Sequence, residues 1–401
     1  MIKSIVLVTD SYPPSRTSAA LQLKDLAVEF LNQGITPTVI TSDSRAKYLS
    51  TITELNGISV LRLKTPEHKN IGKIRRAIAE MLMPFFLITN FRKSALKNMQ
   101  WDAVIWYSPS IFLGPFIYYL KKKNAGLSYL ILRDIFPAWA LDLQIIRKGP
   151  VYYFFRIFER FQYSIADFIG VQAKGNLNYF KTWPSFAHKK TEVLQNWLSP
   201  KPVRNCSINV STLPIANRKI FIYAGNMGIA QGVGDLLLLA EALLSRTDIG
   251  FLFIGRGSDL DLLRLEAKNR NLVNSVFCEE IDADEIPALY AQCHVGLIAL
   301  DVRHKTHNIP GKFLSYINSG LPVLALINDG NDLKEIIEKY KVGEASTSRS
   351  MECLLKLAES IIEEISVQDC NISIRCKRLA REIFSSKIAV KQISRALSEI
   401  S

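Results

Sequence analysis

The sequence predicts an α/β protein with two domains, each built on a parallel β-sheet. Two observations lead to this prediction. Strand-like apolar runs alternate with helix-like runs in both halves of the chain, and a glycine-rich turn joins a strand to a helix over residues 218–239. The chain has 401 residues, of which 48% are hydrophobic. At about 150 residues per domain, it is long enough to bury two cores.

The first half opens with a β-α-β unit, which produces a parallel sheet. The unit consists of a strand at 4–9, a helix at about 18–33 and a strand at 37–41. Further strands are expected at 103–107, 128–132, 168–172 and near 193–194. The loop 10–18 follows the first strand, and Arg133-Asp134 follow the strand 128–132. We therefore expect both at the carboxyl edge of the sheet, where ligands bind.

The second half repeats this alternation after a linker at 198–218 that is rich in Pro, Ser and Asn. Strands are expected at 219–224, 249–254, 275–278, 294–298 and 322–327, and helices at 233–245, 258–270, 284–292, 310–318 and 331–340. A final amphipathic helix at about 373–398 is expected to cross back to the first domain. The predicted divisions are an N-terminal domain at 1–200, a C-terminal domain at 201–380 and a returning helical segment at 381–401.

The glycine-rich turn after the strand 219–224 is interpreted as a phosphate cradle. Gly225, Gly228 and Gly232 let the backbone turn sharply and come close to a ligand, and the following helix offers unpaired N–H groups. The spacing matches neither the Walker loop nor the dinucleotide-binding pattern. The structural alternative is an ordinary tight connection between a strand and a helix.

The excess positive charge lies in the first half of the chain. The formal net charge is +13; residues 1–200 hold 26 Lys and Arg against 13 Asp and Glu, whereas residues 201–401 hold 24 of each. Basic residues flank apolar and aromatic ones at 69–99 and again at 145–163. This pattern favours an anionic membrane surface as partner, with a pair of core helices carrying a solvated basic face as the alternative. Nucleic acid is not expected, because no recognised binding motif appears.

The cysteines and the first residues of the chain indicate its compartment. All six cysteines lie in the second half without metal-ligand spacing, so we expect reduced core thiols, a cytoplasmic protein and no metal. The chain enters a strand almost at once, and no signal peptide is expected.

Taken in order, these segments resemble the retaining glycosyltransferases of family 4, which have the GT-B fold of two Rossmann-like domains facing across a cleft. The resemblance covers nearly the whole chain and is closest to the bacterial surface-polysaccharide branch that includes N-acetylfucosamine transferases of the WbuB type. It rests on the proline loop after the first strand and on these segments: Trp101-Asp102-Ala103-Val104-Ile105, Arg133-Asp134-Ile135-Phe136-Pro137, Val193-Leu194-Gln195-Asn196, Ala224-Gly225-Asn226-Met227-Gly228, Phe253-Ile254-Gly255-Arg256-Gly257, Ile286-Pro287-Ala288-Leu289-Tyr290, Pro310-Gly311-Lys312 and Ser319-Gly320-Leu321-Pro322-Val323.

The resemblance implies three groups of site residues. The catalytic group is Lys312, which would neutralise the leaving diphosphate, with Asp134 and His307. The donor-binding group is Gly225, Asn226, Gly228, Gln231, Gly232, Arg256, Asn308, Ile309, Pro310 and Ser315, and the acceptor-binding group is Tyr12, Arg16, Thr17, Ser18 and Arg133. His307 and Ser315 stand where many family members have two glutamates. Structural alternatives remain for several of these: an ion pair with Arg133 for Asp134, a surface turn for Arg256, a loop position for His307 and a solvent-facing position for Ser315.

The resemblance also implies an activity. It is the transfer of a sugar, such as N-acetylfucosamine, from a UDP-sugar to a polyprenyl-diphosphate-linked saccharide, with retention and without a metal or other cofactor, in O-antigen or capsule synthesis. The enzyme would then be peripheral on the inner face of the cytoplasmic membrane. Two alternatives stay open, a UDP-sugar 2-epimerase on the same fold and a non-catalytic binding protein.

Overall fold

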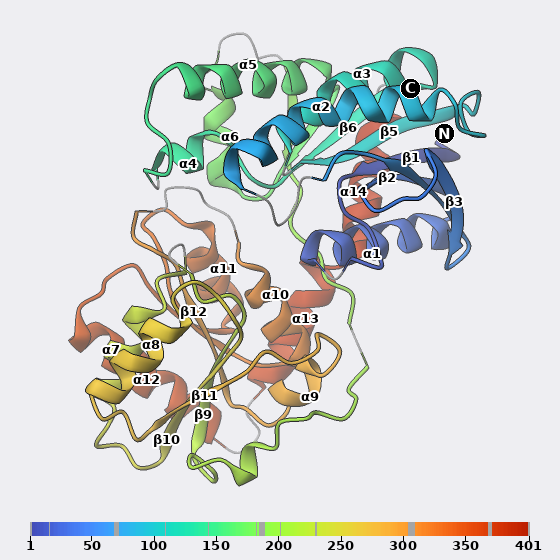
Figure 1. Ribbon diagram of the computed structural model, residues 1–401. Helices are drawn as coiled ribbons and strands as arrows, with labels where there is room; N and C mark the ends of the chain where they lie inside the picture. Colours follow the sequence, from blue (N-terminus) through green and yellow to red (C-terminus); the bar gives the residue numbers. More distant parts are fainter. Residues whose placement is uncertain are drawn as a thin grey trace. The chain divides into compact units, whose positions relative to one another are not determined.

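A computed structural model describes residues 2–15, 17–67, 72–108, 110–142, 144–181, 183, 189–200, 202–228, 231–303, 309–367 and 371–399. The chain forms two compact units, each an α/β layer structure (Figure 1). Unit 1 is Met1–Trp197 together with Ser386–Ser401, and unit 2 is Leu198–Ser385. Within the described residues, no helix has both the length and the apolar character needed to cross a membrane.

Unit 1 contains an eight-stranded sheet in the order β3-β4-β2-β1-β5-β6-β7-β8. All neighbouring strands pair in parallel except β3 and β4, which form an antiparallel hairpin that the sequence analysis did not foresee. The predicted strands are confirmed. The bounds are β1 (Ser4–Thr9), β2 (Thr36–Asp43), β3 (Ser50–Leu55), β4 (Ile58–Lys64), β5 (Trp101–Ser108), β6 (Ala125–Leu132), β7 (Phe168–Val171) and β8 (Lys190–Val193).

Helices cover both faces of this sheet (Figure 1). On one face α1 (Ser18–Asn32) packs against α14 (Ser386–Ser398), around buried residues such as Phe30 and Val390. On the other face α2 (Lys73–Phe91), α3 (Gly114–Lys123) and α5 (Pro150–Ile165) form a second layer around Phe91, Trp106 and Phe116. Shorter helices complete the unit: η1 (Ile111–Leu113), α4 (Ala138–Asp142) and α6 (Lys174–Lys181).

Unit 2 contains a six-stranded parallel sheet in the order β11-β10-β9-β12-β13-β14. Its strands are β9 (Lys219–Ala224), β10 (Ile249–Ile254), β11 (Ser275–Cys278), β12 (Val295–Ala299), β13 (Val323–Leu326) and β14 (Gly343–Ser346). Its helices are η3 (Val210–Thr212), α7 (Gly234–Ala242), α8 (Leu260–Asn269), α9 (Ile286–Tyr290), α10 (Gly311–Ser319), α11 (Asp332–Tyr340), α12 (Met351–Ser366) and α13 (Ile372–Ile383). The five predicted strands are confirmed, and β14 and α12 were not foreseen.

The C-terminal helix is two helices, so the prediction of one helix at 373–398 was wrong. Helix α13 belongs to unit 2 and packs on α10, and it ends at Phe384, whose ring contacts Phe313 at 5.7 Å. Helix α14 starts at Ser386 in unit 1. The helix breaks because its two parts bury their apolar stripes in different cores.

The cysteines in the described residues are free thiols. Cys376 is buried in the unit 2 core, and Cys206, Cys278, Cys293 and Cys353 are half-buried. Cys370 lies outside the described residues.

Candidate active site

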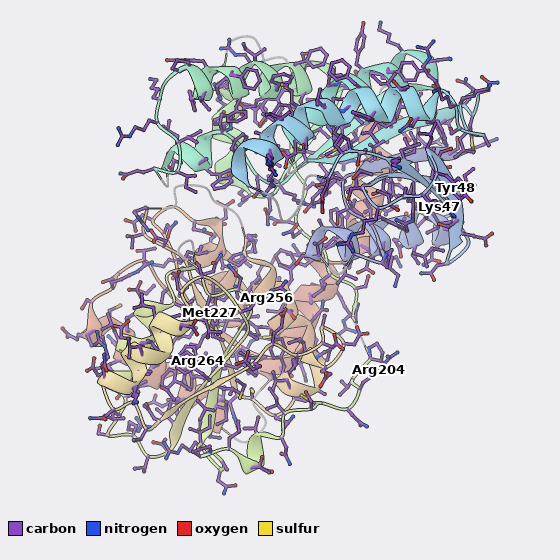
Figure 2. All side chains as sticks on the ribbon, in the orientation of Figure 1. Lys47, Tyr48, Arg204, Met227, Arg256 and Arg264 are labelled. Atoms are coloured by element: carbon purple, nitrogen blue, oxygen red, sulfur yellow. The ribbon has the colours of Figure 1, made fainter. Side chains whose placement is uncertain are left out.

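The predicted phosphate cradle consists of two glycine loops that are joined through their main chains. The Gly225 N–H donates to the Ile254 carbonyl at 2.8 Å, and the Met227 N–H donates to the Arg256 carbonyl at 2.7 Å. Figure 2 labels Met227 and Arg256 in these adjacent loops. A Cβ on Gly255, where φ is +143°, would lie 2.0 Å from the Gly225 carbonyl oxygen. The contact therefore requires glycine at 255, and it fixes the shape of the loop that follows β9.

Lys312 lies across this loop. It is the second residue of α10, after the N-cap Pro310. A Cβ on Gly225 would meet the Lys312 Cε at 2.7 Å and the Nζ at 3.4 Å, so the end of the lysine side chain lies directly against the loop. The Nζ lies 4.8 Å from the centre of the Tyr223 ring. Burial lowers the pKa of Lys312 to about 8.

The surroundings of Lys312 leave its positive charge available to a ligand. No carboxylate in the described part of the chain lies within ion-pair distance of its ammonium. The Tyr223 ring supplies a cation–π contact, and the Tyr223 hydroxyl donates to the Asn226 carbonyl at 2.6 Å. A partly buried cation without a protein anion beside it suits an anionic ligand.

Tyr316 holds α10 against the sheet and was missed by the sequence analysis. Its buried hydroxyl accepts from the Ala224 N–H at 3.2 Å and is 3.1 Å from the Ile222 carbonyl oxygen, to which it donates. Lys312 and Tyr316 are four residues apart, so they lie on the same face of the helix. Tyr316 thus fixes the position from which Lys312 reaches the glycine loop. A tyrosine one turn after the Pro-Gly-Lys segment was the available signal.

Two predicted donor-binding side chains bind each other. The Asn226 Nδ2 donates to the Gln231 Oε1 at 2.9 Å, and the Gly228 N–H donates to the same oxygen at 3.2 Å. The amide at 228 is therefore already paired in this state, and Gln231 must turn away before that amide can bind a phosphate. Gly232 has a left-handed φ of +56°, and its Cβ position lies 3.1 Å from the Asp301 nitrogen.

The other residues predicted to bind the donor differ in how far they are buried. The Arg256 side chain is 79% exposed and pairs with Glu280 at 3.3 Å, as expected of a surface arginine. Ser315 is half-buried and hydrogen-bonds to Tyr290, which differs from a fully solvent-facing position. Ile309 is buried in the core. His307 and Asn308 lie outside the described residues.

In unit 1, the predicted acceptor loop lies at the carboxyl end of β1 and caps α1. The Thr17 Oγ1 accepts from the Ala20 N–H at 3.3 Å and lies 2.9 Å from the Ser11 Oγ. Ser18 begins α1 and is exposed, whereas Tyr12 is buried and its hydroxyl has no hydrogen-bond partner. Burial raises the pKa of Tyr12. Arg16 lies outside the described residues.

Arg133 and Asp134 point to different environments at the end of β6. Arg133 is buried, with its guanidinium 4.6 Å from the Trp197 ring and its Nη1 donating to the Leu194 carbonyl at 2.9 Å. Burial lowers the pKa of Arg133. Its Nε and Nη2 have no hydrogen-bond partner. Asp134 is exposed at the same edge. Arg133 therefore braces the strand ends, whereas Asp134 is exposed and its charge favours the charged form of Arg133.

The two basic segments of unit 1 form an amphipathic helical layer. Helix α2 exposes Ile78, Leu82, Phe85 and Phe86, and α5 exposes Val151, Tyr153, Phe154, Ile157 and Phe161. Both helices pack on α3, and Tyr118 of α3 contacts Phe161 of α5 with ring centres 6.3 Å apart. A pocket of about 390 Å³ on α5 is lined by Lys148, Tyr152, Tyr153, Arg156, Ile157 and Arg160. Exposed aromatic residues interleaved with cations suit an anionic interface.

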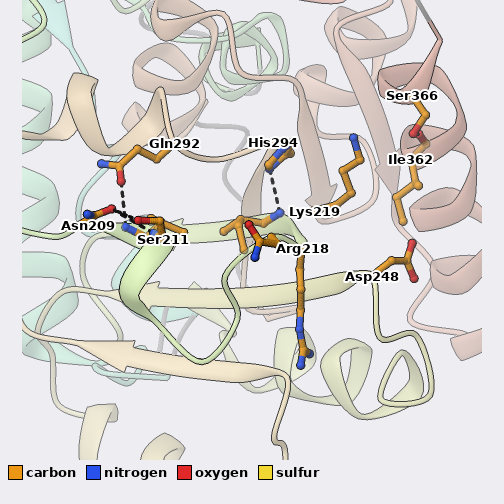
Figure 3. Close-up of a pocket in the computed structure, with 12 residues that line it drawn as sticks. Asn209, Ser211, Arg218, Lys219, Asp248, Gln292, His294, Ile362 and Ser366 are labelled. Atoms are coloured by element: carbon orange, nitrogen blue, oxygen red, sulfur yellow. Dashed lines mark hydrogen bonds between the residues drawn. The ribbon is translucent and has the colours of Figure 1, made fainter.

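A further pocket of about 550 Å³ lies at the opposite end of the unit 2 sheet, where the strands begin (Figure 3). Arg218, Lys219 and His294 line it. Two of its polar side chains already hydrogen-bond to the main chain: the His294 Nδ1 accepts from the Ile220 N–H at 3.0 Å, and the Gln292 Oε1 accepts from the Val210 N–H at 2.9 Å. Within the described residues, no group of His, Cys, Asp and Glu side chains could hold a metal ion.

The architecture is that of the GT-B fold. HepE of Anabaena in complex with UDP-glucose superimposes on this chain with a TM-score of 0.69 at 16% identity, and the alignment covers 99% of both chains. The expected fold is confirmed.

Residues 208–373 match the family described as glycosyl transferases group 1, and this match lies within unit 2 and includes the glycine loops and Lys312. The probable glycosyltransferase WbjE of Pseudomonas aeruginosa is 22% identical over 309 residues, covering 75% of each chain. The putative colanic acid biosynthesis glycosyl transferase WcaI of Escherichia coli K12 is 24% identical over 235 residues, covering 53% of this chain and 54% of that protein.

Proposed function

We propose that the protein is a glycosyltransferase that moves a sugar from a UDP-sugar to a polyprenyl-diphosphate-linked saccharide in bacterial surface-polysaccharide synthesis. The observation that carries the proposal is the partly buried Lys312 ammonium lying over the Gly225 loop. Support comes from the group 1 family match of unit 2, from the names of the two relatives and from the UDP-glucose bound to HepE.

The chemistry requires stabilisation of a leaving diphosphate. As the bond between the sugar and the diphosphate breaks, negative charge grows on the phosphate oxygens, and a preorganised cation lowers the barrier. The Lys312 ammonium meets this need, since its position is fixed by Tyr316 and Gly225. A bound diphosphate would also raise the pKa of Lys312 above its value of about 8 and keep it charged. Asn226 and Gln231 can add neutral hydrogen bonds.

We propose transfer with retention of configuration. In this mechanism the acceptor hydroxyl attacks the face that the diphosphate leaves, and the departing phosphate takes its proton, while the protein contributes positioning and charge. Asp134, exposed at the carboxyl edge of the unit 1 sheet, would orient the acceptor hydroxyl. His307 would contact the donor sugar, and Ser315 would hold a ribose hydroxyl of the nucleotide. An N-acetylated deoxyhexosamine such as N-acetylfucosamine is the specific candidate for the sugar. A family 4 assignment and a role in O-antigen or capsule synthesis belong to the same proposal.

We also propose that unit 1 docks on the anionic inner face of the cytoplasmic membrane. The excess positive charge of the first half and the exposed apolar residues of α2 and α5 support this docking. Apolar side chains enter the headgroup boundary while neighbouring cations meet anionic lipids. This arrangement would bring the enzyme to an acceptor that is itself anchored in lipid.

The activity is tested by a screen of nucleotide sugars. A ligand that binds the folded state raises the melting temperature, so the screen identifies the donor, and the stabilising sugar nucleotide is then incubated with lipid-linked acceptors. We expect stabilisation by UDP and transfer with retention. Absence of both UDP binding and transfer contradicts the proposal. Appearance of the 2-epimer without acceptor supports an epimerase instead, and UDP binding without any turnover supports a binding protein.

Membrane docking is tested by sedimentation with anionic vesicles at low salt. We expect the wild type to sediment and the quadruple variant Arg75→Glu, Arg76→Glu, Arg92→Glu and Lys93→Glu to remain in solution. The matched control makes the same change in charge at exposed positions of unit 2: Lys268→Glu, Lys339→Glu, Lys356→Glu and Arg378→Glu. Sedimentation of the first variant, or loss of sedimentation in the control, refutes the assignment of these segments.

A further inference from the structure

We infer that an apolar groove beside α2 binds the isoprenoid chain of the acceptor, an inference that rests on the proposed function. The groove belongs to unit 1 and has a volume of about 540 Å³, within the usual range for ligand sites of about 300–1,000 Å³. It is lined by Leu49, Lys64, Thr65, Pro66, Phe85, Phe86, Thr89 and Asn90. The lining comes from the end of β4, the residue before β3 and one side of α2.

The walls of the groove are apolar and exposed. Phe85 is 61% exposed, Leu49 48% and Phe86 44%. On the same helix Ile78 and Leu82 are also exposed, so the groove continues into the apolar surface of α2. Lys47 and Tyr48, labelled in Figure 2, precede Leu49 in the chain, and the Lys47 Nζ lies 5.9 Å from the centre of the Tyr48 ring. A connected set of exposed apolar side chains of this kind marks an interaction site.

The polar groups of the groove favour a hydrocarbon chain over a peptide. The Asn90 Nδ2 already donates to the Lys64 carbonyl at 2.8 Å, and the Lys64 N–H donates to the Leu49 carbonyl at 3.0 Å. A bound peptide needs partners for its main-chain groups, and the Asn90 amide and the Lys64 main chain already hydrogen-bond within the protein. A branched hydrocarbon needs none, and burying it against aromatic walls is favourable.

The position of the groove suits an acceptor that carries a diphosphate. The groove opens at the carboxyl end of β4, which pairs with β2, which in turn pairs with β1. Neighbouring strands lie about 4.8 Å apart, so the groove lies about 10 Å from β1 and from the loop that is predicted to contact the acceptor. Arg62 of β4 donates to the Pro13 carbonyl in that loop. Lys64, the last residue of β4, lines the groove and adds a positive charge there.

These positions define how the acceptor lies on unit 1. The isoprenoid chain enters the groove from the membrane along α2, the diphosphate lies near Lys64, and the saccharide continues along the strand ends toward Asp134. The groove would then select acceptors by their lipid, in addition to any selection by their sugar.

The test fills the groove. Thr89→Trp places a large ring on the exposed side of α2 that lines the groove, and Leu262→Trp is the control because Leu262 is exposed on α8 of unit 2 and does not line the groove. Binding of farnesyl diphosphate is measured by calorimetry without vesicles, with inorganic pyrophosphate as the headgroup reference. We expect wild type and Leu262→Trp to bind farnesyl diphosphate at least tenfold more tightly than pyrophosphate. We expect Thr89→Trp to lose at least tenfold in affinity for farnesyl diphosphate.

A second variant, Phe86→Ser, removes one wall and is expected to weaken farnesyl diphosphate binding in the same direction. Equal affinity of wild type for farnesyl diphosphate and pyrophosphate overturns the inference, as does wild-type affinity in Thr89→Trp. The proposed function is tested separately, because thermal stabilisation by UDP depends on residues of unit 2. If Thr89→Trp binds farnesyl diphosphate normally while UDP still stabilises it and transfer continues, only the groove is refuted. If UDP neither binds nor supports transfer in the wild type, the glycosyltransferase proposal fails.

Discussion

Replacing Lys312 by methionine should stabilise the protein while disabling its proposed chemistry. Burial lowers the pKa of Lys312 from 10.5 to about 8. Because one pKa unit corresponds to about 1.4 kcal/mol, keeping this ammonium in its native place costs about 3 kcal/mol of folding free energy at neutral pH. Methionine has a similar length and no charge, so Lys312→Met recovers much of that cost. For a unit of this size the melting temperature should rise by roughly 5–10 °C at pH 7.

The pH dependence of this stabilisation has a definite sign. Between pH 8 and 10.5 the unfolded chain holds the Lys312 proton more tightly than the native state does, so wild-type stability rises with pH relative to the variant. The advantage of Lys312→Met is therefore largest below pH 8 and shrinks toward pH 10. Differential scanning calorimetry at pH 7 and pH 9 measures both values. Lys339→Met, at an exposed position of α11, is the control and should change little.

The same variant should lose activity. Removing one preorganised charge from a developing oxyanion costs roughly 100- to 1,000-fold in kcat/KM. In the wild type, kcat/KM for the donor should fall above pH 8 as Lys312 of the free enzyme loses its proton. If Lys312→Met lowers the melting temperature at pH 7, or keeps wild-type turnover, then Lys312 is not a strained cation held for a diphosphate.

Three other substitutions test the parts that support the site. Gly255→Ala should lower the free energy of unfolding by at least about 2 kcal/mol, since its Cβ would collide with the Gly225 carbonyl. The control is Gly234→Ala, whose Cβ meets no atom within 4 Å and which should leave the melting temperature unchanged. Tyr316→Phe should lower the free energy of unfolding in urea by about 1–3 kcal/mol, because the buried Ala224 N–H loses its partner. The same variant should bind UDP more weakly. Unchanged UDP affinity would show that Tyr316 does not position Lys312. Asp134→Asn should lower acceptor kcat/KM, whereas Arg133→Met should change it less, because Asp134 is exposed and Arg133 is buried; the reverse pattern would exchange their roles.

Much of the fold could be predicted from the sequence, because its local patterns agree with the final structure. The strands β1, β9, β10 and β11 were predicted with their observed bounds, since each is a short apolar run between clear turn signals. The β3–β4 hairpin was missed although Asn56-Gly57, both with positive φ, form the usual two-residue hairpin turn. Helix α12 was also missed, although Leu354, Ala358 and Ile361 repeat at helical spacing.

The site could be predicted only in part. The pairing of the glycine loop with Lys312 followed from residue types that suit a diphosphate, and the two do lie in contact. The sequence could not show that Gln231 occupies the Gly228 amide, because that contact depends on the folded path of the loop. Nor could it show that Arg133 is buried and Asp134 exposed. That difference arises from the rings of Trp197 and Tyr107, which reach Arg133 only in the folded sheet.

The most direct test of the central claim is the pKa of the Lys312 ammonium, measured by NMR of a selectively labelled lysine with and without UDP. We expect the Lys312 pKa to be about 8 in the free protein and to rise clearly when UDP binds, because the diphosphate pairs with the charged form. A pKa near 10.5 in the free protein, or a pKa that does not move when UDP saturates the site, would contradict it.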